Sequence, residues 1–482
     1  MIDSLAVAAR RHRNHLVRWA VIASLAILLA ALGYAAVKVD PFLALAITVV
    51  PLGLFALLKR IELGLIGMML TAVFLRFRIP TGTASEVVLS LVVCAGILAL
   101  WVSKMLVTDK KFTLKSCPAN TPLLAFMVTV FVSLAWSYAF RDVLVHQAGS
   151  PFVLVASAVV MALLPGTFLL VANLVRDVRW LHIMVGLFLA QGLVTLAVTL
   201  PIDLELSFSE TLRQLVFRNP IVWVNTQGLF SMWHVSIALS LAIFNRKLAG
   251  GWRAVLLVYT AAWFYWGFFL RLSWLAGWVP AFVAVAVIVF FRSRELFIPL
   301  LIVMIVAAGG FYLRTSFEAE AEESGFTRLA AYEVNWRVTS QHLIFGTGPG
   351  GYASYYMSYF PTEAMASHSN YIDIIAQTGI VGSFFIVWFF FAQARGGYRL
   401  RRELEGRGDF AESLTIAVLG GTAGCIVAMG LGDWLFPFAY TQSIAGFDAA
   451  MFNWFFMGSL WAVRHTLSPA GDGPSLVDGA AA

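Results

Sequence analysis

His368 and three arginines (Arg213, Arg218 and Arg271) are the residues whose types and positions favour chemistry. His368 stands directly before a strongly apolar run, and an imidazole can accept or donate a proton near neutral pH. The start of a helix disfavours positive charge, which suits a neutral imidazole that acts as a general base. The alternative is a histidine that only ends a loop.

The arginines favour capture of an anionic ligand, because a planar guanidinium matches the oxygens of a phosphate. Arg271 lies between two apolar runs, and Arg213 and Arg218 lie in the segment TLRQLVFRN. Snorkelling to the membrane edge is the alternative for Arg271, and an ordinary surface loop is the alternative for the other two. Together with His368, the three could surround a diphosphate and a sugar hydroxyl.

A Gly/Pro-rich segment, GTGPGGY at 346–352, precedes His368 and is expected to hold the backbone in irregular conformations. Between the two lies a Tyr-rich stretch. Ser367, Ser369 and Asn370 are candidates to cap the helix that follows. Asp433 and Tyr440, in a later loop, are further candidates for sugar contacts, with structural capping as the alternative.

The elements that must position these residues are membrane spans. Hydrophobic residues make up 60% of the chain and charged residues 12%, with a mean hydropathy of +0.83, which excludes an ordinary soluble protein. Apolar runs of about 20 residues recur, and each can cross a hydrocarbon core as a helix. We predict an all-α, polytopic bundle of 12–14 spans. They lie near 19–37, 41–57, 61–77, 85–103, 121–138, 152–175, 180–200, 220–244, 254–270, 273–291, 296–313, 369–392, 412–431 and 442–463.

The distribution of basic residues predicts the orientation of these spans. Of the 33 Lys and Arg residues, 23 fall in segments on the side of the N-terminus, so the positive-inside rule places both termini in the cytoplasm. The same rule explains the net charge of +7 without a nucleic-acid partner. We expect one membrane domain over 1–467, in which 314–368 is a long outside loop, and a disordered cytoplasmic tail at 468–482. Within the loop, Thr327–Leu343 is compatible with an amphipathic helix. A cleaved signal peptide is the alternative for the first span.

Metal and cofactor motifs are missing from the sequence. Cys94, Cys117 and Cys425 form no CxxC pair, and there is no HExxH, DxD or Walker motif, so we expect no cofactor and no tightly bound metal. A line of intramembrane acidic residues, which would indicate an ion-coupled transporter, is also missing.

The segment GTGPGGY followed by SHSNYIDIIAQTGIVG resembles the signature of the O-antigen ligase/polymerase superfamily, a G-x-G-P-G turn and then H-[SN]-x-Y before a helix with G-(I/L)-x-G. Matching positions are Gly346, Gly348, Pro349, Gly350, His368, Asn370, Tyr371, Gly379 and Gly382. LRQLVFRNP is similar to the arginine segment of the family, with Ile221 at the usual Asn. RLSWLAG only approximates its S-R-G element, and Gln377 stands at the usual Glu.

The resemblance implies a membrane glycosyltransferase, with a fold like that of the polytopic GT-C enzymes, in the bacterial inner membrane. It would transfer a glycan, with inversion and without metal, from a polyprenyl-diphosphate donor to a glycan or lipid A-core hydroxyl at the periplasmic face. His368 would be the base, and Arg213 and Arg271 would stabilise the diphosphate. Arg218, Tyr352, Asn370 and Tyr371 would bind substrate. A lipid-linked glycan flippase and a protein O-oligosaccharyltransferase are the alternatives.

Overall fold

The computed structural model describes residues 60–75, 78–80, 86–146, 151–217, 228–271, 275–300, 302, 306, 326–361 and 366–467. The chain divides into two compact units, Met1–Gly64 and Leu65–Ala482. Of the first unit only 60–64 is described, and it forms the turn that begins the first described helix.

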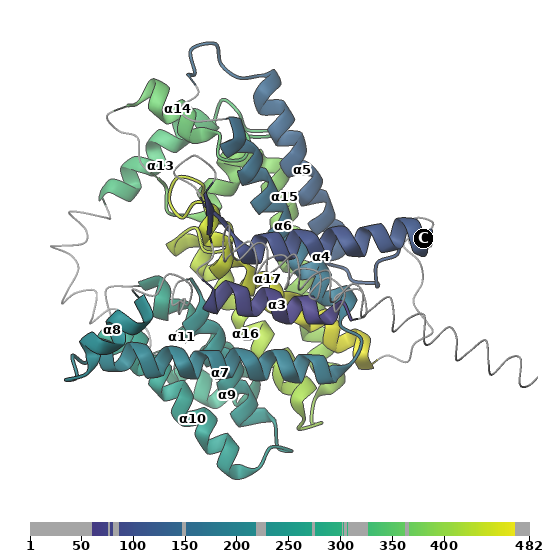
Figure 1. Ribbon diagram of the computed structural model, residues 1–482, viewed down its shortest axis with the longest axis vertical. Helices are drawn as coiled ribbons and strands as arrows, with labels where there is room; N and C mark the ends of the chain where they lie inside the picture. The colour runs from purple at the N-terminus through teal and green to yellow at the C-terminus, as the bar shows by residue number, and fades with distance from the viewer. Residues whose placement is uncertain are drawn as a thin grey trace, which may run out of the picture. The chain divides into compact units, whose positions relative to one another are not determined.

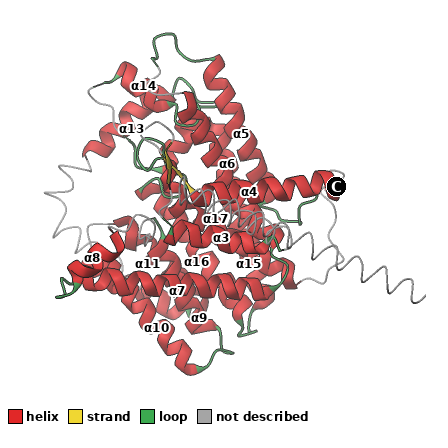
Figure 2. Ribbon diagram, viewed as in Figure 1, coloured by secondary structure: helices red, strands yellow, loops and turns green. Residues whose placement is uncertain are grey.

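Most of the described chain is helical (Figure 2). The α-helices are α3 Glu62–Phe74, α4 Leu89–Ser103, α5 Asn120–Ala139, α6 Pro151–Leu174, α7 Val178–Asp203, α8 Ser209–Phe217, α9 Phe230–Phe244, α10 Gly250–Phe264, α11 Leu275–Arg292, α13 Phe326–Thr339, α14 Tyr352–Tyr359, α15 Asn370–Leu404, α16 Phe410–Leu431 and α17 Phe447–Leu467. Two π-helical segments, η1 Lys104–Thr108 and η2 Tyr265–Leu270, extend α4 and α10, and η4 Ile444–Gly446 is a 3₁₀ turn. Strands β1 Arg78–Pro80 and β2 Glu86–Val88 form a small antiparallel hairpin.

The predicted all-α membrane fold is confirmed. Within the described residues, eight helices are long and apolar enough to cross a membrane, and α3 and α9 are shorter apolar helices. The predicted spans 19–37 and 41–57, most of 296–313, and the tail at 468–482 lie outside the described residues. The last span begins at Phe447 rather than near 442, because the preceding residues hydrogen bond to Asp433 and then form η4.

Helix α5 packs on its neighbour in sequence, α6, and on α15, which comes from a distant part of the chain (Figure 1). α15 also packs on α16, and α16 packs on α9, α11 and α17. This contiguous packing of apolar helices provides the frame for the loops at their ends.

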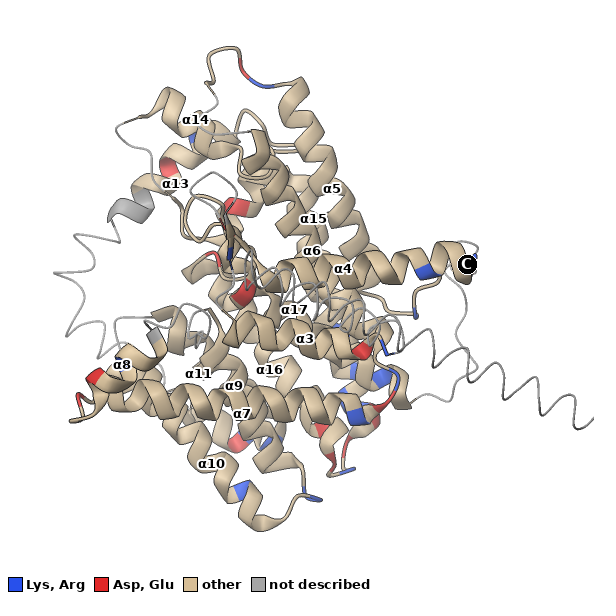
Figure 3. Cartoon of the chain, in the orientation of Figure 1, with Lys and Arg blue, Asp and Glu red and all other residues tan. Residues whose placement is uncertain are grey.

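Two loops that the basic-residue count assigns to one side, after α9 and after α15, meet at one end of this frame. The N–H of Lys247 donates to the carbonyl of Gly408 (3.2 Å), and the ammonium of Lys247 lies 3.6 Å from Asp409. Figure 3 shows several Lys and Arg positions, coloured blue, near the end of α15 and the loop that follows it. These contacts agree with the prediction that the two loops lie on the same side of the membrane. That this side is the cytoplasmic one stays a prediction.

Candidate active site

Helix α15 is broken at Gly379, whose φ of 67° and ψ of −168° interrupt the helical backbone. A break leaves carbonyls and N–H groups without their helical partners. Here the Gly/Pro segment supplies new ones: the N–H of Thr347 donates to the Ala376 carbonyl (2.9 Å) and the N–H of Gly348 to the Gln377 carbonyl (3.1 Å). On the other side of the break, the N–H of Ile380 donates to the Leu343 carbonyl (2.8 Å). The irregular segment predicted from sequence therefore docks into a gap in the helix that follows it.

Glycine is required in this segment by both conformation and space. Gly346 and Gly348 have φ values of +67° and +88°, a region that L side chains rarely adopt. A Cβ on Gly346 would lie 2.6 Å from the Ala376 carbonyl oxygen, and one on Gly348 would lie 2.5 Å from Oγ of Ser137. The two glycines thus allow the close approach of backbone to α15 and α5.

Gln377 joins the turn to the helix with both ends of its amide. Its Oε1 accepts from the N–H of Gly350 (2.7 Å), and its Nε2 donates to the carbonyl of Asp373 (3.1 Å). Ser133 of α5 adds hydrogen bonds to the carbonyls of Phe345 and Gln377. A glutamate at 377 could accept the first bond but would have no N–H for the second.

His368 lies at the mouth of this broken helix, with φ of 48° and its side chain 49% exposed. Its Nδ1 lies 3.9 Å from Oδ1 of Asp433. The predicted cap by serine hydroxyls is wrong: Ser369 is the N-cap residue but makes no side-chain capping bond. Its hydroxyl donates to the carbonyl of Met429 on α16 instead (3.3 Å), and that of Ser367 donates to Asp373 (2.6 Å).

Asp433 is buried and strongly hydrogen bonded behind His368. Its Oδ2 accepts from the N–H of Phe438 (3.0 Å) and from the hydroxyl of Thr441, and its Oδ1 accepts from Gln442 (3.2 Å). Burial acts to raise the pKa of Asp433, but His368, Thr441 and the Phe438 N–H outweigh it and hold the pKa below its usual range. The group is therefore a carboxylate at neutral pH, facing an imidazole.

Asn370 positions this carboxylate. The side chain of Asn370 is fully buried, its Nδ2 donates to the carbonyl of Phe436 (2.7 Å), and its Oδ1 accepts from the N–H of Leu435 (2.8 Å). These bonds fasten the loop that carries Asp433 to the first turn of α15. Asn370, predicted to bind substrate, is here a link between the two sides of the His368–Asp433 pair.

Asp373 is a buried carboxylate that sequence reasoning missed. Its Oδ1 accepts from the hydroxyls of Tyr352 and Ser367, each at 2.6 Å, and its Oδ2 has no hydrogen-bond partner among the described residues. It lies within electrostatic range of both Asp433 and His368. A signal was available: Asp373 follows His368 by five residues, at the start of an apolar run where a carboxylate is costly.

Residues 234–387 match a family model described as O-antigen ligase. The match supports an O-antigen ligase/polymerase-like family. The resemblance predicted from the signature is thereby confirmed. No curated protein matches the chain. The O-antigen ligase match contains the signature turn, His368, Asp373 and the break at Gly379, whereas Asp433 lies beyond its end.

The other two predicted substrate contacts in this O-antigen ligase-like segment have hydroxyls bonded to protein. Tyr352 is buried, with its ring stacked on Phe438 (centroids 4.4 Å apart) and its hydroxyl on Asp373. Burial, and then the charge of Asp373, raise the pKa of Tyr352, so it stays a donor. Tyr371 is half-exposed, and its hydroxyl donates to the carbonyl of Ile426 on α16 (2.6 Å).

Arg271 follows η2 and forms a two-pronged ion pair with Asp203, the last residue of α7. Its Nε and Nη2 lie 3.0 and 2.9 Å from the two carboxylate oxygens. Trp266 donates to the same carboxylate (2.8 Å), and its ring lies 5.4 Å from the guanidinium carbon. Asp203 is thus a second carboxylate that the sequence analysis did not single out.

The remaining two arginines stand apart from His368. Arg213 is exposed on α8, 3.6 Å from Glu210, and Arg218 lies outside the described residues. No hydrogen bond or ion pair between described residues joins His368 to Arg213 or Arg271. The structure therefore brings His368 close to carboxylates, and the predicted diphosphate site formed by the arginines stays a prediction.

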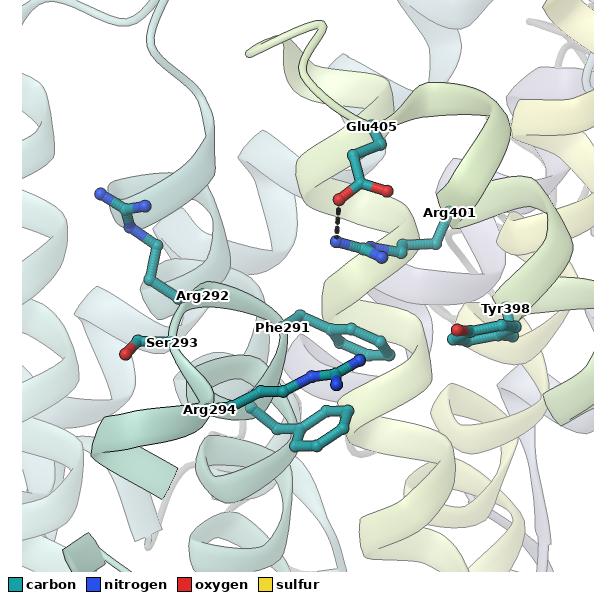
Figure 4. Close-up of a pocket in the computed structure, with 8 residues that line it drawn as sticks. Phe291, Arg292, Ser293, Arg294, Tyr398, Arg401 and Glu405 are labelled. Atoms are coloured by element: carbon teal, nitrogen blue, oxygen red, sulfur yellow. Dashed lines mark hydrogen bonds and ion pairs between the residues drawn. The ribbon is translucent and has the colours of Figure 1, made fainter. Parts of the chain in front are cut away.

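A cavity of about 200 Å³ lies near the opposite end of α15 from His368 (Figure 4). Arg401 reaches Glu405 there (2.8 Å), and its guanidinium lies 4.9 Å from the ring centre of Phe291. Tyr398 and Arg294 also line it. It contains none of the residues predicted for the site.

Proposed function

We propose that this protein is a membrane glycosyltransferase that moves a glycan from a polyprenyl-diphosphate-linked donor to an acceptor hydroxyl at the outer face of the bacterial inner membrane. The observation that carries the proposal is the half-exposed imidazole of His368 with the buried carboxylate of Asp433 at its Nδ1. The match to the O-antigen ligase model supports the substrate class at the coarser level of a glycan-handling membrane protein.

In this mechanism, Asp433 orients the imidazole so that Nε2 faces the acceptor. The acceptor oxygen attacks the anomeric carbon from the side opposite the diphosphate and gives its proton to Nε2 of His368. A bond forms between that oxygen and the carbon, and the bond from the carbon to the phosphate oxygen breaks. The electron pair leaves with the diphosphate, so the configuration inverts. Asp433 then stabilises the imidazolium.

The arginines would stabilise the charge that builds on the leaving group. Two N–H groups of Arg271 are engaged by Asp203, which leaves three of its five for phosphate oxygens. Arg213 is exposed and paired only loosely with Glu210. A diphosphate is already a good leaving group, so we propose that these cations suffice without a metal.

The test is transfer by the purified protein with lipid-linked repeat units as donor. His368→Ala is expected to lower kcat by about 10²- to 10⁴-fold, the range of a general base. His146→Ala removes an exposed histidine elsewhere and serves as the control. Full activity of His368→Ala would exclude the base assignment.

The same assay separates the acceptors and the non-enzymatic alternative. Longer chains on the lipid alone indicate a polymerase, and a required lipid A-core or protein hydroxyl indicates a ligase or a protein transferase. Movement of the lipid-linked glycan across protein-only vesicles, without any new glycosidic bond, would instead indicate a flippase.

A further inference from the structure

We propose that a second cavity, between α13, α14 and the loop after α5, binds a neutral sugar residue of the glycan at a distance from the reacting bond. This inference rests on the proposed function and adds a subsite to it. The cavity has a volume of about 300 Å³, within the range of small-molecule sites. Its lining residues are Asp142, Arg337, Val338, Gln341, His342, Tyr355, Tyr359 and Phe360. Figure 1 shows α13 and α14 lying next to each other at this place.

The lining combines aromatic faces with a few polar groups. Tyr355, Tyr359 and Phe360 supply rings on which the C–H face of a pyranose can stack. Among the polar groups, the Tyr359 hydroxyl donates to Oδ2 of Asp142 (3.3 Å), and the Arg337 guanidinium lies 5.8 Å from the ring centre of Phe360. An apolar wall with a small set of placed polar atoms is the usual make-up of a ligand site.

One polar atom in the cavity lacks a partner at hydrogen-bonding distance. The side chain of His342 is only 11% exposed, and its Nε2 makes no hydrogen bond within the described chain. That nitrogen lies 3.6 Å from Oδ1 of Asp142, and its ring meets Tyr355 edge-on with centroids 5.0 Å apart. A sugar hydroxyl placed beside the pair could accept from one and donate to the other, which would satisfy the buried nitrogen.

The charges around the cavity favour a neutral sugar over an acidic one. Arg337 is the only Lys or Arg among the described lining residues, and its guanidinium is held by Glu333 (2.6 Å). Asp142 adds a further carboxylate. A uronic acid would face the carboxylate of Asp142 and an arginine already engaged by Glu333, whereas a neutral pyranose can use the same groups as donors and acceptors.

The cavity and the candidate active site share one buried apolar cluster. Val338 and Tyr355 line the cavity and belong to the same cluster as Tyr352 and Phe438. The hydroxyl of Tyr352 binds Asp373, and the N–H of Phe438 binds Asp433. Packed side chains therefore fix the distance between a sugar in the cavity and His368. A fixed distance of this kind would select glycans in which the bound sugar and the reacting hydroxyl are the right number of sugar units apart.

The test is saturation-transfer NMR on the full-length protein in detergent, with glucose, galactose, mannose, N-acetylglucosamine and glucuronic acid as probes. Tyr359→Ala and the nearly isosteric Asp142→Asn remove the aromatic face and the carboxylate. Tyr398→Ala is the matched control, because Tyr398 is similarly exposed (46% against 40% for Tyr359) and lines the cavity of Figure 4. We expect a neutral sugar to bind the wild type and both His368→Ala and Tyr398→Ala. We expect affinity to fall at least about tenfold in the two cavity variants.

Equal signals in Tyr359→Ala, Asp142→Asn and the wild type would overturn the subsite, as would binding of glucuronic acid alone or of no probe. A kinetic arm separates this failure from failure of the proposed function. If transfer occurs and Tyr359→Ala raises KM while kcat holds, both stand. If transfer occurs with KM unchanged in Tyr359→Ala, the subsite is wrong. If sugars bind at the cavity but no glycosidic bond forms, the subsite stands and the transfer proposal fails.

Discussion

The hydroxyl of Tyr352 donates a 2.6 Å hydrogen bond to Asp373, and this bond joins the Gly/Pro segment to the first turn of the helix that His368 precedes. Both side chains are buried, so the bond forms away from water. It is one of two hydroxyl contacts on the same carboxylate oxygen, while the other oxygen has none. The stability of the buried Asp373 carboxylate should therefore depend on each of these two hydroxyl donors.

Removal of the phenol oxygen tests this link. Tyr352→Phe keeps the ring stacked on Phe438 and leaves Asp373 with one donor, from Ser367. We expect a loss of about 1–3 kcal/mol in the free energy of unfolding, the usual cost of an unsatisfied buried polar group. The measurement is thermal unfolding in detergent followed by intrinsic fluorescence. Tyr398→Phe, on an exposed side chain, should change nothing. Identical stability of both variants would show that Asp373 does not need the phenol.

The Gly/Pro segment and its histidine could be predicted from sequence because their spacing is local. The partners of these residues could not. Asp433 follows His368 by 65 positions, and Asp203 precedes Arg271 by 68, so only the folded bundle brings each pair together. The signature marks Gly379 as a matching position, but the break there could not be predicted, because it depends on carbonyls that the earlier segment satisfies.

Alanine substitutions at two glycines should distinguish the destabilisation caused by a steric clash from that caused by an unfavourable backbone conformation. Gly346 and Gly406 both have positive φ, +67° and +85°. A Cβ on Gly406 would meet nothing within 4 Å, whereas one on Gly346 would press on the Ala376 carbonyl. Gly406→Ala should lower the free energy of unfolding by only about 1–2 kcal/mol, because an L side chain is unfavourable in the left-handed conformation. Gly346→Ala should cost more and lower Tm further, and equal shifts in Tm would contradict the docking of the segment on α15.

The charge of Asp433 should stabilise the fold in a pH-dependent way. Its folded pKa is lowered, so its stabilising contribution is present above the unfolded pKa, about 3.9, and is lost as pH falls through the folded value. Asp433→Asn removes this charge, so the stability gap to the wild type should be full at pH 7 and shrink below about pH 4. Unfolding followed at both pH values measures it. Asp109→Asn, an exposed carboxylate, should show no such trend, and a gap that widens in acid would reverse the sign assigned to Asp433.

The same substitution should slow transfer. Without the carboxylate, the imidazole of His368 loses the group that orients it and stabilises its positive form, and we expect kcat to fall by about 10²-fold or more. KM should change little, because Asp433 is buried and out of reach of substrate. A rise in KM at unchanged kcat would indicate a binding role in place of the positioning one.

The contribution of Arg271 to transfer should depend on the shape of its guanidinium as well as on its charge. The fork of its guanidinium holds both oxygens of Asp203 and still leaves N–H groups for a phosphate. Arg271→Lys keeps the positive charge but can form only one of these contacts, so we expect kcat/KM to fall by about tenfold or more. Arg78→Lys, at an arginine paired with Glu86 in the β1–β2 hairpin, is the comparison and should leave kcat/KM unchanged. If Arg271→Lys retains full kcat/KM, the guanidinium only closes the end of α7 against η2, and the diphosphate must be held elsewhere.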